Sequence, residues 1–150
     1  MSAEPRPRAQ RRRDTEHRLT HDVDAWVATA SADGAPYLVP LSFDWDGEAL
    51  LVATPAGSLT GRNLADTRTT RLALGHTRDV IMIEGEVEVL EIDGLPQQQG
   101  DRFVARTGFD PRALATPYRW FRITPRRIQA WREENELRDR ELMRDGRWLV

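Results

Sequence analysis

Alternating apolar and polar residues, bounded by tight-turn pairs, are the pattern that most constrains the fold of this chain. Over residues 37–45 the odd positions are Tyr, Val, Leu, Phe and Trp, and this period of two is typical of a half-buried strand. Asp33-Gly34 precedes the segment and Asp46-Gly47 follows it, and both pairs favour the short turns of antiparallel hairpins. The chain is therefore expected to build its sheet from antiparallel neighbours.

The same pattern recurs along the chain. Further strands are predicted at residues 25–31, 49–54, 71–75, 81–89 and 118–131, and helices at 58–66 and 95–107. Gly85 interrupts an alternating strand, which indicates a bulge or a close backbone approach, and Pro40 indicates an edge, a bulge or a ligand contact because it cannot donate to a ladder. Many strands and few helices predict a mainly β, α+β class, with a small antiparallel barrel.

The ends of the chain are more polar than its middle. Residues 1–18 are predicted to be a disordered basic tail, with the arginine run 11–13, although Asp14 or Thr15 could cap a short helix through His21. Residues 19–150 are assigned to one domain with a charged C-terminal extension, partly helical, over 133–150. The tail is interpreted as a solvated extension, and a nucleic-acid contact through residues 6–13 is the alternative.

Composition narrows the function classes. The chain has no cysteine and three scattered histidines, so neither disulfides nor a metal centre are expected. All 22 basic residues are arginine, which excludes Schiff-base chemistry on a lysine. The net charge of −2 gives no global case for nucleic-acid binding, and no apolar run approaches the roughly 20 residues that span a bilayer. A cytoplasmic protein without membrane partners is expected.

A polar segment after the predicted strand 49–54 offers a phosphate site. It contains hydroxyls, glycines and a single cation, Arg62, at the start of a predicted helix. Helix amino termini carry unpaired N–H groups and partial positive charge, and a guanidinium fork matches phosphate oxygens. On spacing alone, the same residues favour an ordinary capped helix with an exposed arginine, because short phosphate-loop patterns recur by chance. No nucleophile, base and orienting acid come together in the sequence, so no catalytic residue is assigned.

Several segments, in order, resemble the pyridoxamine 5'-phosphate oxidase-like superfamily, the flavin-binding split β-barrels. The first three are 26–43, 62–64 and 77–85, and two later ones, 103–112 and 123–131, look like its actinobacterial branch of flavin- or deazaflavin-dependent oxidoreductases. The resemblance covers roughly residues 22–146 and implies a split barrel that forms a homodimer, with two cofactor sites at the subunit interface. The implied cofactor is FMN or the deazaflavin F420.

The resemblance also implies where the cofactor lies. Its ring would lie along Val39 to Ser42 and Ala53-Thr54, and its phosphate at the 58–63 segment. Many FMN-binding members have a lysine where this chain has Thr60, which weakens the case for FMN and leaves F420, or an empty site, open. The predicted cofactor-binding residues are Val39, Pro40, Leu41, Ser42, Ala53, Thr54, Ser58, Thr60, Gly61, Arg62, Asn63, Arg78 and, from the dimer partner, Trp131.

The implied function is that of an oxidoreductase that transfers a hydride between the cofactor and a small organic substrate. In such enzymes the cofactor carries the reaction and the protein supplies binding, orientation and electrostatics. The alternative is a protein that binds the flavin or deazaflavin without turnover, as a carrier or a sequestering module.

Overall fold

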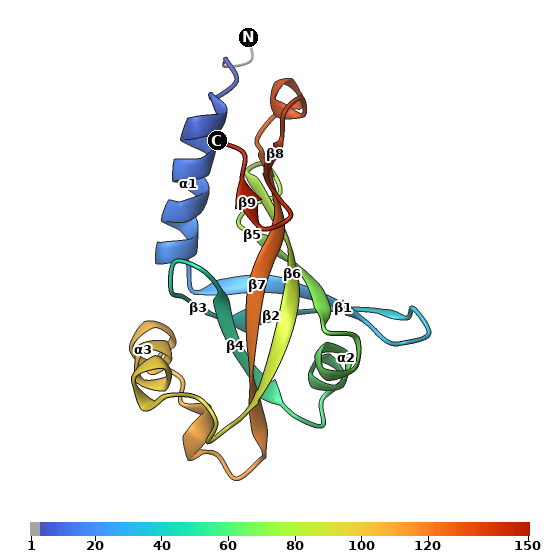
Figure 1. Ribbon diagram of the computed structural model, residues 1–150, viewed down its shortest axis with the longest axis vertical. Coiled ribbons are helices and arrows are strands. Elements are labelled where there is room, and N and C mark those ends of the chain that lie inside the picture. Colours follow the sequence, from blue (N-terminus) through green and yellow to red (C-terminus); the bar gives the residue numbers. More distant parts are fainter. Residues whose placement is uncertain (1–3) are drawn as a thin grey trace.

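A single antiparallel sheet, curled into a half-barrel, forms the body of the molecule in the computed structural model, which describes residues 4–150 (Figure 1). The strands are β1 (Asp24–Ala30), β2 (Pro36–Ser42), β3 (Asp44–Trp45), β4 (Leu50–Pro55), β5 (Thr69–Leu74), β6 (Val80–Glu91), β7 (Tyr118–Trp131), β8 (Glu141–Arg144) and β9 (Arg147–Trp148). The α-helices are α1 (Arg8–His21), α2 (Leu59–Thr67) and α3 (Gln97–Thr107), with short 3₁₀ turns at Pro111–Ala113 and Glu134–Glu136. The predicted split-barrel class is confirmed.

The strand order is β2-β1-β5-β6-β7-β4-β3, and β8 and β9 extend the sheet from β7. The strands predicted at 25–31, 49–54, 71–75, 81–89 and 118–131 are all present within a few residues of their expected ends. The segment 37–45 divides into β2 and β3 at Phe43, which is fully buried. Pro40 lies on β2, which is an edge strand of the sheet. Because no strand pairs with the outer edge of β2, the missing N–H of Pro40 removes no ladder hydrogen bond on that edge.

The predicted irregularity at Gly85 is a bulge in the long ladder between β6 and β7. Glu84 pairs with Arg127 and Gly85 with Pro125, so Arg126 has no partner in the register. A Cβ atom on Gly85 would stand 2.5 Å from the Ile123 side chain, which explains why glycine occupies this position. A bulge bends and twists a strand pair, and here it lies in the two longest strands of the sheet.

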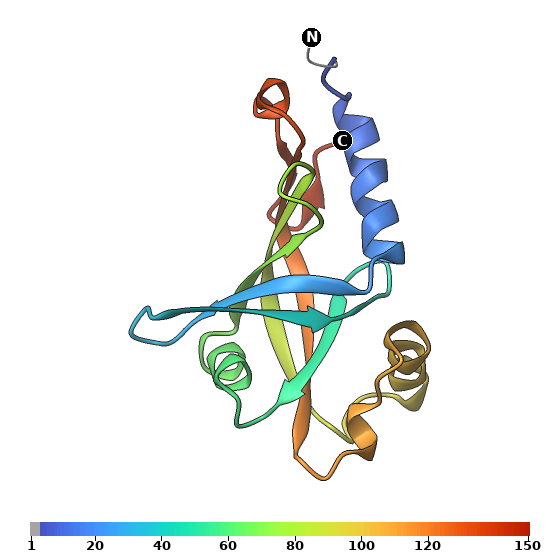
Figure 2. The ribbon, with the colours of Figure 1, turned by 180° about the vertical axis from the view of Figure 1, so that it is seen from behind.

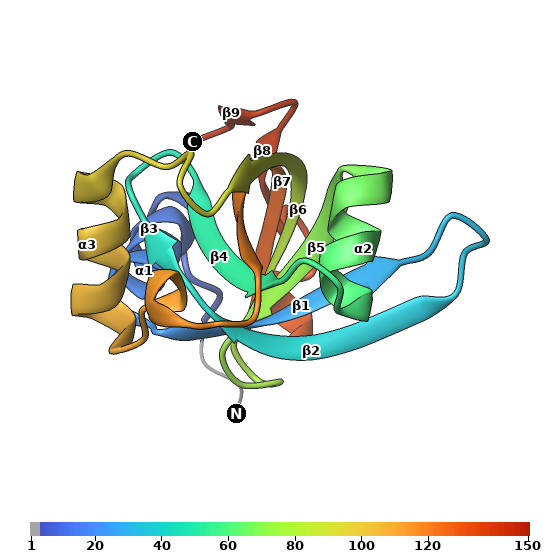
Figure 3. The same ribbon diagram turned by 90° about the horizontal axis from the view of Figure 1, so that it is seen from below.

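Hydrophobic side chains fill the inside of the curl. Val27, Leu50, Ile83 and Ile128 are fully buried there, together with Leu64 of α2. A second cluster forms on the other face of β4, where Leu51 and Ala53 pack with Phe103 of α3 and with Trp120. Both faces of β4 are therefore covered, and Figure 3 shows α2 and α3 on opposite sides of the curled sheet.

Helix α1 corrects the prediction of a disordered tail over residues 1–18. Residues 1–3 lie outside the described residues, but residues 8–18 are helical, and Arg11, Thr15 and Leu19 form a buried stripe at a spacing of four. The helix lies beside the end of the sheet that carries β8 and β9 (Figure 2), and these strands replace the partly helical extension predicted there. None of the helices within residues 4–150 has the length and hydropathy to cross a membrane.

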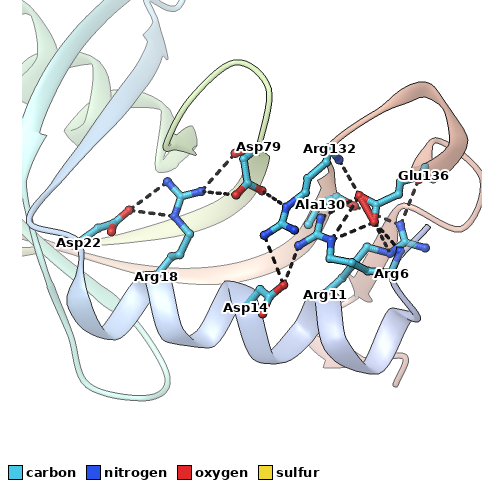
Figure 4. Close-up of polar contacts among 9 residues, drawn as sticks. All are labelled: Arg6, Arg11, Asp14, Arg18, Asp22, Asp79, Ala130, Arg132 and Glu136. Carbon is cyan, nitrogen blue, oxygen red and sulfur yellow. Dashed lines mark hydrogen bonds and ion pairs between the residues drawn. The ribbon is translucent and has the colours of Figure 1, made fainter. Parts of the chain in front are cut away.

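A buried carboxylate fastens α1 to the C-terminal region (Figure 4). Glu136 is only 2% exposed, and its Oε2 accepts hydrogen bonds from the backbone N–H of Arg6 at 3.0 Å and from Arg6 Nε at 2.9 Å. Arg6 Nη2 and the backbone N–H of Arg132 donate to Oε1 at 2.9 and 2.8 Å. Arg11 Nη1 donates to the carbonyls of Ala130 and Glu136 at 3.2 and 3.1 Å. The contacts of Arg6 and Arg11 join residues more than 100 positions apart.

Glu136 should therefore contribute to stability in a pH-dependent way. Burial alone raises the pKa of Glu136, but the hydrogen bonds from Arg6 and from the backbone outweigh burial, so the pKa lies below its ordinary value. A carboxylate with a lowered pKa stabilises the fold above its unfolded-state pKa of about 4.3, and this contribution is lost as the pH falls through the folded-state pKa.

We expect Glu136→Gln to lower the free energy of unfolding at pH 7 by about 2–3 kcal/mol, because it removes the counter-charge that the Arg11 guanidinium faces and leaves Arg6 with Asp14 alone. Urea unfolding at pH 7 and at pH 3.5 measures the effect, and the gap between wild type and variant should narrow at the lower pH. Glu134→Gln, an exposed neighbour, is the control and should change little. Equal stability of Glu136→Gln and wild type at pH 7 would contradict this role.

Candidate functional site

A cleft opens between β2, β4 and α3, where the curl of the sheet brings its edge strand β2 against β4. Its volume is about 280 Å³. Five residues of the predicted cofactor site line it, three from β2 and two from β4: Pro40, Leu41, Ser42, Ala53 and Thr54. Two segments that the sequence separates by ten residues or more therefore meet in one surface depression, as the predicted ring site requires.

Aromatic side chains, which the sequence prediction did not include, also line the cleft. Phe103, Phe109 and Tyr118 line it together with Pro55. Phe103 meets Trp120 edge to face at 5.1 Å between ring centroids, and Phe109 lies 5.7 Å from Tyr118. Phe103 and Phe109 belong to the segment 103–112 that resembles the family, and this resemblance was the sequence signal that could have assigned them to the site.

The loop that carries Phe109 is fastened to α3 by Arg112. Its Nε donates to Asp110 Oδ1 at 2.9 Å, and its Nη2 donates to Asp101 Oδ1 at 3.0 Å. The hydrogen bond with Asp110 raises the pKa of Arg112, and the hydrogen bond from Arg112 lowers the pKa of Asp110, so the pair stays charged. A Cβ on Gly100 would come within 2.6 Å of this guanidinium, so the absence of a side chain at Gly100 makes room for Arg112 on the surface of α3.

The amino terminus of α2 stands next to the cleft. Ser58 caps the helix, because its Oγ accepts a hydrogen bond from the Gly61 N–H at 3.0 Å and donates one to the Pro55 carbonyl at 2.8 Å. The Thr54 hydroxyl lies 3.3 Å from the same Oγ and links the cleft to the cap. No acidic residue lies in the first turn, so the positive end of the helix dipole is not neutralised by a side chain there.

The predicted phosphate residues divide into two groups. Arg62 is exposed and has no ion-pair partner among residues 4–150, so its guanidinium is free to meet an anion. Thr60 and Asn63 are buried, and Asn63 Nδ2 donates to Thr29 Oγ1 of β1 at 3.1 Å. The Asn63 side chain therefore holds α2 against the sheet in the single chain. The structure therefore contains the predicted capped helix, and the phosphate contact stays a prediction.

Three predicted site residues lie away from the cleft. Val39 of β2 pairs with Val27 of β1, and it is partly buried but does not line the cleft. Arg78 lies in the turn after the six residues of β5, which at about 3.3 Å per residue separates it from α2 by about 20 Å. Trp131 pairs with Val80 at the same end, and the Arg140 guanidinium lies 5.5 Å from its ring centroid. Within one chain, Arg78 and Trp131 do not reach Arg62.

The position of the helix amino terminus depends on Gly61, because a Cβ there would stand 2.4 Å from the backbone oxygen of Pro55. We expect Gly61→Ala to lower the free energy of unfolding by about 1–3 kcal/mol, because backbone must move to relieve the overlap. Gly57→Ala is the matched control in the same turn, since no atom lies within 4 Å of its Cβ position. Chemical denaturation of both variants checks the difference, and equal stabilities would refute the proposed close approach.

The curled antiparallel sheet and its edge cleft define the class of split-barrel proteins, and comparison with known proteins agrees. The sequence model of the pyridoxamine 5'-phosphate oxidase family matches residues 18–132. The chain belongs to this family. No protein in the search of curated sequences matches it.

Solved structures with the same fold include proteins of several kinds. An F420 reductase is 19% identical with a TM-score of 0.60, over 75% of this chain and 94% of its own. A putative pyridoxamine 5'-phosphate oxidase from Listeria innocua is 12% identical with a TM-score of 0.64, over 81% and 98%. The heme storage protein HutZ from Vibrio cholerae is 16% identical with a TM-score of 0.64, over 75% and 88%. These similarities show the fold.

Proposed function

We propose that this protein is an oxidoreductase that binds F420 or FMN in the cleft between β2 and β4 and transfers a hydride between the cofactor and a small organic substrate. The observation that carries the proposal is the cleft itself, in a member of this family, because five residues implied as ring contacts line it together. The F420 reductase among the similar structures supports the deazaflavin. We place the reaction in the cytoplasm.

The cleft fits the planar part of such a cofactor. Pro40, Leu41, Phe109 and Tyr118 are among its lining residues, and apolar and aromatic groups of this kind suit a planar ring. The volume of about 280 Å³ lies just below the range of ordinary ligand sites, roughly 300–1,000 Å³, so one chain would accommodate part of the cofactor. A bound flavin or deazaflavin would supply the hydride chemistry.

The residues of this chain would bind and orient the group. The Ser42 hydroxyl is occupied, because it donates to Asp24 Oδ1 at 2.6 Å, and none of the three histidines lines the cleft. We therefore assign no acid or base. Arg62 and the capped amino terminus of α2 would hold the phosphate, with Ser58 as the cap, while Thr60 and Asn63 hold the helix in place.

We further propose that two chains pair through the outer face of the sheet. Trp26, Leu38 and Met82 are 49%, 57% and 40% exposed. Trp26 pairs with Pro40 and with Ala73, and Ala73 pairs with Met82. The side chains of these four residues therefore form a row across four strands, and Leu38 lies two residues from Pro40 on the same face of β2. An exposed apolar face of this kind marks an interaction surface. A second copy of the chain would bury it, and we assign Arg78 and Trp131 as the residues that the second copy contributes to the cofactor site.

A carrier without turnover is the second candidate, because a heme storage protein has the same fold and both functions need a pocket. The absorbance spectrum and mass of the molecule that copurifies identify the bound group. Steady-state reduction of a panel of quinones and enones by the reduced cofactor then separates the two candidates. Turnover supports the oxidoreductase, and tight binding without turnover supports the carrier. Failure to bind either FMN or F420 would contradict both.

We expect Arg62→Ala to weaken cofactor binding by about 10- to 100-fold, because it removes a charge-assisted contact worth about 1.5–3 kcal/mol. Arg62→Lys should recover only part of the affinity, since a point charge replaces a two-pronged donor. Fluorescence titration of FMN and of F420, separately, measures the effect in each variant.

Arg138→Ala is the matched control for Arg62, because it removes another exposed arginine without an ion-pair partner in the described chain. Arg78→Ala tests the residue assigned to the partner. If Arg62→Ala binds both cofactors as wild type does while Arg78→Ala loses them, the phosphate site has been placed at the wrong end of the chain.

We expect Trp26→Glu to convert the proposed homodimer to a monomer, because it puts a charge into the centre of the apolar row. Sedimentation velocity at micromolar concentration measures the state of the wild type and the variant. Leu114→Glu is the control, since Leu114 is 46% exposed but lies outside the sheet face. A monomeric wild type would remove the basis for the proposed pairing.

A further inference from the structure

A second and larger pocket lies at the other end of the molecule, between α1 and the C-terminal strands. Its volume is about 690 Å³. Arg127 and Gln129 are the lining residues that fall within the segment matched by the family, and the remainder come from α1 and from residues 137–149. Figures 1 and 2 show α1, β8 and the C-terminus together at this end, away from α2 and α3. The pocket is thus formed mainly by additions of this chain to the family fold.

The pocket is positively charged in a chain whose net charge is −2. Four arginines line it, at positions 8, 127, 140 and 144, against two carboxylates, Asp139 and Glu141. The difference is an excess of two positive charges. This excess matches the charge of a phosphate monoester, about −1.5 to −2 at neutral pH.

Glu141 is already occupied by two of these arginines. Arg127 Nε donates to its Oε2 at 2.6 Å, and Arg144 Nη2 donates to its Oε1. The hydrogen bond from Arg127 leads the contributions that lower the pKa of Glu141, so the carboxylate stays ionised. Each guanidinium has five N–H donors, so both arginines retain N–H groups that Glu141 does not use.

The other two arginines have even fewer partners. Arg8 Nη2 donates to the Glu141 carbonyl at 2.6 Å, while its buried Nε has no hydrogen-bond partner. Arg140 has no ion pair with any of residues 4–150, and its guanidinium is free apart from its contact with the Trp131 ring. A buried donor is normally satisfied, so the unpaired Arg8 Nε indicates an acceptor that the pocket is built to receive, and the exposed Arg140 guanidinium adds a second unpaired charge beside it.

We propose that this pocket binds a small phosphorylated organic molecule. The phosphoryl oxygens would accept hydrogen bonds from the guanidinium groups of Arg8, Arg140 and Arg144, whose planar forks match phosphate geometry. The organic part would lie against Leu137 and Leu149, which are both exposed and both line the pocket. The site is separate from the cofactor cleft and does not depend on the function proposed there.

Isothermal titration calorimetry of the full chain with phenyl phosphate, at constant ionic strength, tests the proposal. Inorganic phosphate is the second probe. We expect phenyl phosphate to bind more tightly than inorganic phosphate, because only phenyl phosphate reaches the two leucines. Equal affinity for the two probes, or no binding of phenyl phosphate at millimolar concentration, would overturn the assignment.

Variants locate the binding site. Arg140→Gln and Arg8→Gln should each weaken phenyl phosphate binding by about tenfold or more, and Arg140 is exposed, so its variant should fold normally. Arg138→Gln is the matched control, because it removes an exposed arginine two positions away that does not line the pocket. A loss as large in Arg138→Gln would show attraction by general charge alone and overturn the proposal.

Arg62→Ala separates this pocket from the proposed cofactor site. The phenyl phosphate binding that depends on Arg140 should be unchanged in this variant, whereas binding of FMN or F420 should fall. If Arg62→Ala abolishes phenyl phosphate binding and Arg140→Gln does not, the phosphate belongs to the amino terminus of α2, and the second site does not exist. If neither the wild type nor any variant binds FMN or F420, while phenyl phosphate binding is still lost in Arg140→Gln, the second site is supported and the proposed cofactor function is contradicted.

Discussion

The bulge in the ladder between β6 and β7 is the constraint on which the rest of the molecule depends. These are the two longest strands, and the register shift after Glu84 bends them around the buried side chains of the barrel. Gly85 is required at the bend, because a Cβ would overlap with Ile123. The resulting curl brings β2, at one edge, against β4, near the other. Without that approach Pro40 and Ala53 would line separate surfaces, and the cleft would not form.

Charged hydrogen bonds, in contrast, hold the parts that lie outside the barrel. Glu136 accepts from Arg6 and from the backbone of Arg132, and Arg11 reaches the carbonyls of Ala130 and Glu136. Arg106 of α3 donates to the Asp22 carbonyl at the end of α1 and forms an ion pair with Asp44 at 3.5 Å. A chain without lysine uses arginine at each of these joints, where a fork can satisfy two acceptors at once.

This arrangement divides the molecule into two regions, each of which carries one proposed site. The family segment supplies the cleft, the capped helix α2 and the exposed Arg62, which together form the proposed cofactor site. The additions at both ends of the chain supply a pocket with an excess of arginine. β7 connects the regions, since Tyr118 lines the cleft and Arg127 lines the pocket. The two sites are therefore open to independent tests on one chain.

The sequence by itself determined the strands of the family segment, the helices α2 and α3, the irregularity at Gly85, and five of the six residues that β2 and β4 contribute to the cleft. These features follow from period-two alternation, turn pairs and the family resemblance, which are legible over short stretches. Only the tertiary structure decided that residues 8–18 form a helix, that Asn63 is turned toward Thr29, and that Phe109 and Tyr118 close the cleft. The physical reason is the distance along the chain between partners. From its sequence alone, an arginine-rich segment is predicted to be exposed to solvent. Only the fold brings Glu136 next to this segment, and the contact joins Arg6 to a residue 130 positions away.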